Sequence, residues 1–192
     1  MAYLEGTNLV AAYGVVPILH ECSVKVEKGE LAVIVGPNGA GKSTVMRVLL
    51  GMLEATSGSV TLDGNDISML STQERISLGL AFVPQNKNVF PSMTVEENLE
   101  MGAFLRTDDI KKTMEEVYSL FPILYEKRRQ LAEELSGGQR QQVAFGRAMM
   151  TQPSVMLLDE PTAGVSPIVM DEIFSNILDV RDAGMAVLMV EQ

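Results

Sequence analysis

The chain is poor in the residues that build disulfide scaffolds and histidine metal centres. It contains one cysteine, Cys22, one histidine, His20, and no tryptophan in 192 residues. A single cysteine cannot form an internal disulfide, so a reducing cytosol is the compartment that fits best. The sequence gives His20 no evident ligand partner, and nothing in the composition requires a disulfide or a metal for stability.

Basic residues are also scarce. Lys and Arg number 15 against 25 Asp and Glu, which gives a formal net charge of −10 and a pI near 4.6. Because nucleic-acid affinity comes mainly from Lys and Arg side chains that neutralise phosphates, we expect no nucleic-acid partner.

Long apolar runs are missing as well. Runs such as Leu31 to Val35 and Val155 to Leu158 are far shorter than the roughly 18 residues typical of a membrane span. The opening stretch MAYLEGTNLV has neither a basic start nor a sustained apolar segment, so no secretory signal is predicted. The length of the chain suits the core of one domain.

The N-terminal part reads as strands followed by a helix. Residues Tyr3 to Val26 alternate in polarity and predict an antiparallel β element, which leads into a buried strand at Leu31 to Val35. Apolar spacing predicts a helix over Ser43 to Leu53. A further strand is expected at Gly58 to Leu62, closed by the turn-forming pair Asp63-Gly64.

Helix starts are marked further along the chain. Ser71 with Glu74, and Thr94 with Glu97, each have the spacing of a capping box. From Thr94 to Thr151 the pattern is mostly helical with a polar face.

Strands alternate with helices again near the C-terminal end. Val155 to Asp159 and Ala186 to Val190 have the pattern of buried strands, and apolar residues between Met170 and Leu178 recur on one helix face. We therefore predict an α/β fold with a largely parallel sheet core, an N-terminal antiparallel β subdomain and an inserted helical subdomain at about residues 87–150.

The segment GPNGAGKST, from Gly36 to Thr44, has the phosphate-loop spacing between a strand and a helix. Its glycines let backbone N–H groups point at an anion, and the helix that follows directs its positive dipole end at the same place. Lys42 supplies a charge for the β and γ phosphates, and the Ser43 hydroxyl can bind Mg²⁺. The predicted phosphate-binding residues are Gly36, Pro37, Asn38, Gly39, Ala40, Gly41, Lys42, Ser43 and Thr44.

Two adjacent carboxylates end the buried strand in VMLLDEP. Asp159 and Glu160 would lie at the carboxyl edge of the sheet, where α/β proteins bind ligands, and their side chains point in different directions. We assign Asp159 to the Mg²⁺ site and Glu160 to the attacking water as a general base.

The motifs GPNGAGKST, LSGGQ and LLDEP, in this order, resemble the ATP-binding cassette (ABC) ATPases, which are P-loop proteins of the RecA-like fold. The resemblance covers essentially the whole chain and implies ATP and Mg²⁺ as cofactors. In that family LSGGQ closes over the ATP held by a second subunit in a head-to-tail dimer. The residues implied here are Ser136, Gly137, Gly138 and Gln139.

Further positions follow from the same resemblance. Tyr13 stands where these proteins stack an aromatic ring on adenine, and Gln85 where a glutamine links Mg²⁺ and the attacking water to the helical subdomain. The D-loop falls at Ala163 to Ser166. Relatives usually have a histidine near the γ-phosphate where this chain has Gln192, an amide that donates a hydrogen bond but carries no positive charge. The implied catalytic residues are thus Glu160, Gln85 and Gln192.

A finer resemblance rests on SMTVEENLEMGAFLR, EPTAGVSPIVMDEIF and VLMVEQ, which look like the ATPases of branched-chain amino-acid importers. It implies membrane permease partners, a second ATPase subunit as a homo- or heterodimer partner, an indirect role for a periplasmic or extracellular solute-binding protein, and a cytoplasmic location at the inner face of the membrane. The chain would be one nucleotide-binding domain over residues 1–192, shorter at its C-terminal end than the family pattern.

Three alternatives remain at this point. A urea or amide importer of the same group has a similar cassette. A soluble ABC ATPase acting on chromosomes or ribosomes is disfavoured by the acidic charge, and chromosome-type members carry a coiled coil that this chain lacks before LSGGQ. A small-molecule kinase would explain the phosphate loop but not LSGGQ.

Overall fold

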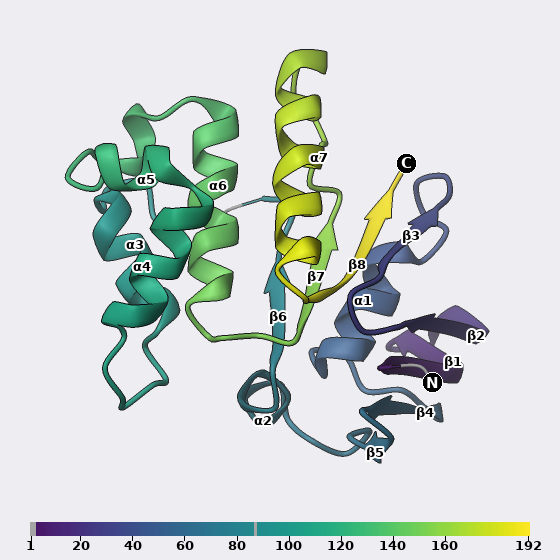
Figure 1. Cartoon of the computed structure of the whole chain (residues 1–192). Coiled ribbons are helices and arrows are strands. Elements are labelled where there is room, and N and C mark those ends of the chain that lie inside the picture. Colours follow the sequence, from purple (N-terminus) through teal and green to yellow (C-terminus); the bar gives the residue numbers. More distant parts are fainter. Residues whose placement is uncertain (1–2, 87) are drawn as a thin grey trace.

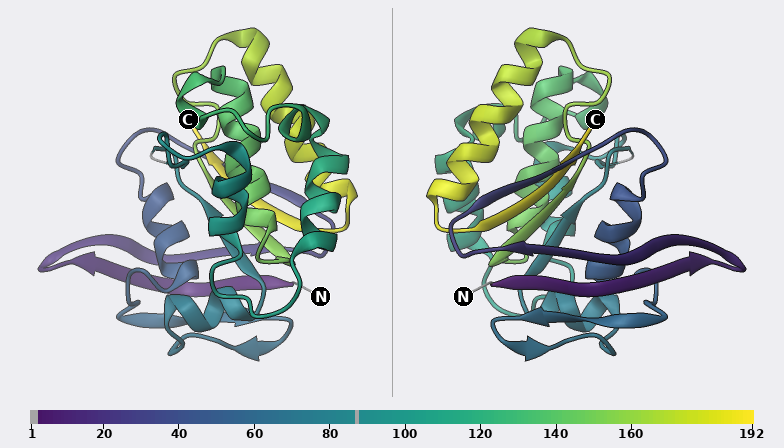
Figure 2. Two further views of the ribbon diagram at one scale, coloured as in Figure 1. Left: turned by 90° about the vertical axis from the view of Figure 1, so that its left-hand side faces the viewer. Right: turned by 90° about the vertical axis from the view of Figure 1, so that its right-hand side faces the viewer.

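The structure, a computed structural model, describes residues 3–86 and 88–192. An antiparallel sheet near the N-terminus has the strand order β2-β1-β4-β5. In it the ends of the first two strands meet in a hairpin, where Tyr13 pairs with Val16. Figure 2 shows this hairpin reaching out beyond the rest of the molecule. Its strands are β1 (Leu4–Tyr13), β2 (Val16–Val26), β4 (Ser57–Leu62) and β5 (Asn65–Asp66).

A parallel sheet with the order β3-β8-β7-β6 forms the second half of the scaffold. Every residue of β7 is buried, as expected for a strand covered on both faces. The predicted α/β fold is confirmed (Figure 1). Strand β6 was not expected from the sequence, because its four residues are too few for a clear pattern. The strands are β3 (Leu31–Val35), β6 (Leu80–Val83), β7 (Val155–Asp159) and β8 (Ala186–Glu191).

Helix α1 (Lys42–Leu50) follows β3 and packs between the two sheets. Its apolar side chains, Val45, Met46, Val48 and Leu49 among them, are almost fully buried against residues of both sheets. The helix is shorter than predicted, because Gly51 adopts a left-handed conformation with φ of 78° and ends it there.

The helices between β6 and β7 form one unit beside the parallel sheet (Figure 1), called the helical unit below. Both predicted capping boxes are present, at Ser71 and Glu74 and at Thr94 and Glu97, and a third joins Ser136 to Gln139. The helical unit consists of α3 (Val95–Gly102), α4 (Lys111–Leu120), α5 (Pro122–Glu126), the 3-10 helix η1 (Ala132–Glu134) and α6 (Gly137–Met149); α2 (Thr72–Ser77) and α7 (Pro167–Asp182) lie outside it.

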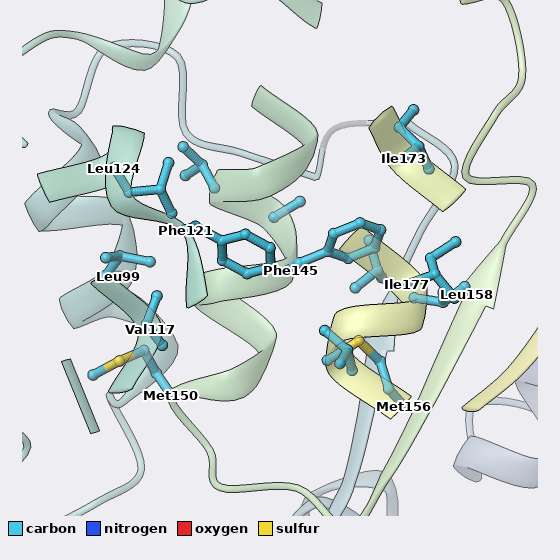
Figure 3. Close-up of a cluster of buried hydrophobic side chains, with 14 of the residues drawn as sticks. Leu99, Val117, Phe121, Leu124, Phe145, Met150, Met156, Leu158, Ile173 and Ile177 are labelled. Atoms are coloured by element: carbon cyan, nitrogen blue, oxygen red, sulfur yellow. The ribbon is translucent and has the colours of Figure 1, made fainter. Parts of the chain in front are cut away.

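One apolar cluster runs from the helical unit into the sheet core. Phe145 of α6 lies at its centre, with Phe121 and Leu124 on one side and Ile173 and Ile177 of α7 on the other (Figure 3). Leu178, which was expected on this face of α7, is 39% exposed. The shared cluster fixes α6, and therefore the LSGGQ segment at its start, relative to the sheet.

Arg75 of α2 is a buried arginine that holds the C-terminal end of α1. Its side chain is 3% exposed, and its guanidinium donates to the carbonyl oxygens of Val48 and Leu49, both at 2.8 Å. It also donates to the carbonyl oxygens of Leu70 and Ser68 at 3.0 and 2.7 Å. Burial lowers the pKa of Arg75. A cation at this end complements the helix dipole, and Arg75 is a donor to the Leu49 carbonyl oxygen, whereas that of Val48 also accepts from the Gly51 N–H at 3.0 Å.

We expect Arg75→Met to lower the free energy of unfolding by about 3 to 5 kcal/mol, because it leaves buried carbonyl groups without donors. Urea unfolding followed by circular dichroism measures this loss. Arg129→Met, at an exposed position, is the matched control and should change stability by less than about 0.5 kcal/mol. Equal, small effects of the two substitutions would contradict the role given to Arg75.

Candidate functional site

The loop between β3 and α1 has the conformation that the phosphate-loop pattern predicts. Gly39 and Gly41 have φ angles of 83° and 91°, a region that residues with a side chain rarely adopt. The loop starts at the carboxyl edge of the parallel sheet, where the Gly36 N–H donates to the Glu191 carbonyl oxygen at 3.4 Å. Helix α1 then begins at Lys42, so its N-terminal N–H groups and positive dipole end face the loop.

Lys42 is held in this loop by backbone oxygens and by one carboxylate. Its side chain is almost fully buried, and the ammonium donates to the carbonyl oxygens of Gly36 at 2.6 Å and Pro37 at 3.1 Å. The Glu160 Oε1 atom lies 3.6 Å from Nζ. The lysine charge therefore points at the concave side of the loop, where an anion would be bound.

Glu160 directly follows β7 and has an unusual backbone conformation, with φ of 45°. Its N–H donates to the Val190 carbonyl oxygen of β8 at 3.0 Å, which helps to hold this turn. Two amides donate to the same carboxylate oxygen, Oε2: Gln85 Nε2 and Gln192 Nε2, each at 2.9 Å. The three predicted catalytic side chains thus lie together.

These groups line a cavity of about 450 Å³ together with Asn38, Gly39, Gly41 and Ser43. A larger cavity of about 850 Å³ lies beside α4, between Lys112 and Met185, and shares no lining residue with the first. We take the smaller cavity as the functional site, because a lysine, a glycine-rich loop, a helix N-terminus and a carboxylate converge there.

The residues expected to bind Mg²⁺ are partly paired with one another. The Ser43 hydroxyl donates to Asp159 Oδ1 at 2.8 Å, and Gln85, which lines the same cavity as Ser43, accepts from Asn86 through its Oε1. A hydroxyl, a carboxylate and an amide oxygen are hard oxygen ligands of the kind that Mg²⁺ prefers. The donor set therefore fits this ion.

Tyr13 and the LSGGQ residues lie apart from the cavity lining. Tyr13 is 44% exposed near the tip of the β1 and β2 hairpin, and its hydroxyl accepts from Arg47 of α1 at 3.0 Å. Ser136 caps α6, with its Oγ accepting from the Gln139 N–H at 3.2 Å, and Gly137 is open to solvent. Helix α6 begins on the side of the molecule toward which the parallel strands point (Figure 1). Ser136 and Gly137 are thus exposed to a ligand carried by another molecule, whereas Leu135 and Gly138 are buried.

Sequence analysis missed two features of the site. Ile18 of β2 lines the cavity, although nothing in its surroundings in the sequence indicates this. Thr162 donates to Glu191 Oε1 through its hydroxyl at 2.7 Å and its N–H at 3.3 Å, which ties the segment after Glu160 to the end of β8. A threonine two residues after Glu160 was the sequence signal that could have indicated this contact.

Among the helices of residues 3–86 and 88–192, none has the length and apolar character of a membrane span.

Comparison with known proteins shows the family to which the chain is similar. Residues 19–163 match the family model described as ABC transporter. The high-affinity branched-chain amino acid transport ATP-binding protein BraG of Pseudomonas aeruginosa is 43% identical over 94% of this chain and 78% of its own length. The probable branched-chain amino acid transport ATP-binding protein LivF of Archaeoglobus fulgidus is 38% identical, over 98% of this chain and 81% of that protein.

A further relative belongs to the same family but differs in its transported substrate, and a solved structure agrees on the fold. The lipopolysaccharide export system ATP-binding protein LptB of Escherichia coli is 34% identical over 100% of this chain and 80% of its own length. A crystal structure of the ADP conformation of an ATP-binding cassette from an ABC transporter superposes with a TM-score of 0.93 at 31% identity. It covers 100% of this chain and 82% of that one.

Proposed function

Because the chain belongs to the ABC transporter family of ATP-binding proteins and is an ATPase of that family, we propose that it energises uptake of branched-chain amino acids through membrane permease subunits. One observation supports ATP hydrolysis at this site. Lys42, Gln85 and Gln192 all contact Glu160 in the cavity beside the phosphate loop. The choice of solute is supported by the functions named for the two relatives at 43% and 38% identity.

Residues Gly36 to Thr44 bind the phosphates of ATP in this proposal. Backbone N–H groups of the loop and the Lys42 ammonium neutralise the phosphate charge, and Tyr13 stacks on the adenine. Mg²⁺, held by Ser43, Gln85 and Asp159, would neutralise charge on the phosphate oxygens.

Glu160 acts as the general base on the attacking water. In the structure its Oε1 faces Lys42 and its Oε2 accepts from two amides, so the carboxylate is held at the edge of the phosphate site. Gln85 and Gln192 orient that carboxylate and donate hydrogen bonds to oxygens near the transferred phosphoryl group. Gln192 performs this role without carrying charge, because an amide does not titrate.

A second ATPase subunit completes the site. Ser136, Gly137, Gly138 and Gln139 at the start of α6 form an anion-binding helix end, and they lie outside the cavity of their own chain. We propose that they close over ATP bound by the partner in a head-to-tail dimer, formed either with a second copy or with a related subunit. Residues 1–192 then act as one nucleotide-binding domain, with a helical subdomain at about residues 87–150.

The permease subunits would bind where apolar side chains are exposed on the helical unit. One exposed apolar residue precedes α3, and three more lie at its end and just after it. Their exposed fractions are 41% for Phe90, 39% for Met101, 75% for Phe104 and 49% for Leu105. A guanidinium, that of Arg147, lies 5.0 Å from the centre of the Phe90 ring. A group of exposed apolar side chains of this kind is typical of an interaction site. We therefore propose that the subunit lies at the inner face of the membrane, on the cytoplasmic side.

The test is to disrupt the encoding gene in its source cell and measure uptake of labelled leucine, isoleucine and valine, with restoration by the intact protein. We expect uptake to be lost and then restored, and affinity purification of the protein from detergent-solubilised membranes to recover permease subunits. Uptake that is unchanged, together with recovery of ribosomes or DNA and no permease, would contradict the proposal in favour of a soluble ABC ATPase.

Lipopolysaccharide export is the second candidate, because a relative of that function covers the whole chain at 34% identity. Import of urea or amides is a further alternative within the same group of cassettes. The same disrupted strain separates these functions. Loss of outer-membrane lipopolysaccharide with normal amino-acid uptake favours export, and loss of labelled urea uptake alone favours the amide importer.

A further inference from the structure

The backbone of Glu160 has a conformation that its place in the sequence does not favour. Its φ is 45°, in the left-handed region that residues with a side chain seldom adopt. Pro161 follows it, and a residue before proline ordinarily has an extended backbone with φ of about −120°. Such a conformation costs free energy and persists only where surrounding contacts hold it. The contacts of this turn therefore decide whether Glu160 stays in that state.

Two backbone hydrogen bonds hold Glu160 itself. Its N–H donates to the Val190 carbonyl oxygen at 3.0 Å, and its own carbonyl oxygen accepts from the Ala163 N–H at 3.1 Å. The first bond joins the ends of β7 and β8, which are neighbours in the parallel sheet (Figure 1). The second closes a turn over residues 160–163. Both bonds use backbone atoms alone, so neither requires a particular side chain.

A side-chain contact joins the same turn to β8. The Glu191 Oε1 atom accepts from the Thr162 hydroxyl at 2.7 Å and from the Thr162 N–H at 3.3 Å. Thr162 is 7% exposed, and a charged acceptor makes hydrogen bonds stronger than a neutral one does. Because Thr162 lies two residues after Glu160, and Glu191 directly after Val190, this contact supports the backbone bond between Glu160 and Val190.

The contact between Thr162 and Glu191 lies beside the proposed catalytic site. Both residues line a cavity of about 400 Å³, together with Glu160 and Gln192. Glu160 and Gln192 also line the cavity of about 450 Å³ beside the phosphate loop, whereas Thr162 and Glu191 are not among the described residues that line it. An effect of Thr162 or Glu191 on a reaction at the phosphate loop would therefore pass through Glu160 and Gln192.

We propose that Thr162 and Glu191 are positioning residues for ATP hydrolysis, whose contact keeps the backbone of Glu160 left-handed and its carboxylate beside Lys42. The inference rests on the general-base role proposed above for Glu160. When the contact is broken, the turn relaxes toward the extended backbone that a residue before proline prefers, and the carboxylate moves away from the attacking water. The phosphate loop is not altered, so ATP binding is retained.

Thr162→Val removes the hydroxyl donor and keeps a β-branched side chain of similar size. We expect kcat for ATP hydrolysis to fall about tenfold and KM for ATP to stay within about twofold, because a misplaced reacting group costs rate more than ground-state binding. Thr162→Ser retains the hydroxyl and should restore kcat to within about twofold of the parent value. Phosphate release at varied ATP concentration measures both constants. Parent kcat in Thr162→Val would overturn the proposal.

Thr113→Val is the matched control for lost stability. Thr113 of α4 is 3% exposed, and its hydroxyl oxygen accepts from Arg106 at 2.9 Å and from Gln152 at 3.0 Å. This variant makes the same chemical change at a buried position that does not contact the proposed site. It should lower the urea midpoint of unfolding and leave kcat unchanged. Equal falls in kcat in the two valine variants would assign Thr162 a role in stability alone.

Glu191 provides a second test at a half-buried position, where folding is less at risk. Glu191→Gln removes the charge but retains an oxygen that accepts both hydrogen bonds, so kcat should stay within about threefold of the parent value. Glu191→Ala removes the acceptor and should lower kcat about tenfold. In the Glu191→Ala background, Thr162→Val should lower kcat no further, since both substitutions break one contact.

Two results with the Glu191 variants would contradict the proposal. Equal falls in Glu191→Gln and Glu191→Ala would show that the charge, and not the contact, is required. A further tenfold fall in the double variant would show that Thr162 acts by another route. Failure of the proposed function is measured separately, because Glu160→Gln would then hydrolyse ATP at the parent rate. Loss of hydrolysis in Glu160→Gln with parent kcat in Thr162→Val contradicts this inference alone.

Discussion

Glu160→Gln should reduce the rate of ATP hydrolysis by about 10² to 10⁴ and leave ATP binding intact, because an amide cannot accept the proton of the attacking water. The substitution preserves the size of a side chain that is 8% exposed and packed against Gln85, Gln192 and Lys42. Lys42 and the phosphate loop remain in place, so the affinity for ATP should change little. With hydrolysis blocked, ATP remains between two subunits, and a dimer should accumulate in MgATP.

Phosphate release measures the rate, and size-exclusion chromatography with light scattering measures the dimer. Glu126→Gln makes the same chemical change at an exposed position of α5 and is the matched control, for which we expect the parent rate and no trapped dimer. A hydrolysis rate near that of the parent protein in Glu160→Gln would show that Glu160 is not the general base. Loss of ATP binding would instead mean that the carboxylate is needed to hold Lys42 in place.

Lys42→Met should greatly lower the affinity for ATP, whereas Glu160→Gln should preserve it. Lys42 is the buried cation of the cavity, held by two backbone carbonyl oxygens and 3.6 Å from the Glu160 carboxylate. Removing the lysine from the charge pair that it would form with the bound phosphates costs about 2 to 5 kcal/mol of binding free energy, which corresponds to roughly 30-fold or more in Kd. The phosphates would in addition face Glu160 without the compensating cation, which further disfavours binding.

Titration with a fluorescent ATP analogue measures the affinity, and far-UV circular dichroism shows that the fold is retained. Lys111→Met removes the same charge at an exposed position of α4, so it controls for the change in net charge. Parent affinity in Lys42→Met would place the phosphate site elsewhere. Equal losses in both variants would show that overall charge, and not the cavity, controls binding.

Much of the fold could be predicted from the sequence where a structure depends on neighbouring residues. The phosphate loop is recognisable because Gly39 and Gly41 take backbone conformations that other residues rarely adopt. The capping boxes at Ser71 and Thr94 were predicted because both partners lie within one helical turn. The hairpin turn at Asp63 and Gly64 has positive φ at both residues, as the pair Asp-Gly indicates.

Other features could not be predicted, because their partners lie far apart in the chain. Arg75 was an ordinary helix residue in the sequence, yet it holds carbonyl groups of α1 more than twenty positions away. Asn98 is one polar residue of a capped helix in the sequence, and only the structure shows that it is fully buried against the preceding loop. Strand β6 was missed because a short apolar run carries too little periodicity.

The phosphate loop, the pair of carboxylates at the end of β7 and the family could be recognised from the sequence alone, because these depend on residues that are consecutive or nearly so. The surroundings of Glu160 depend instead on how the strands are ordered in the folded chain. Gln85 follows β6, Glu160 ends β7 and Gln192 follows β8, and the sheet order places β7 between the other two. The carboxyl ends of neighbouring parallel strands meet at one edge, so two amides from distant segments reach the same oxygen of Glu160.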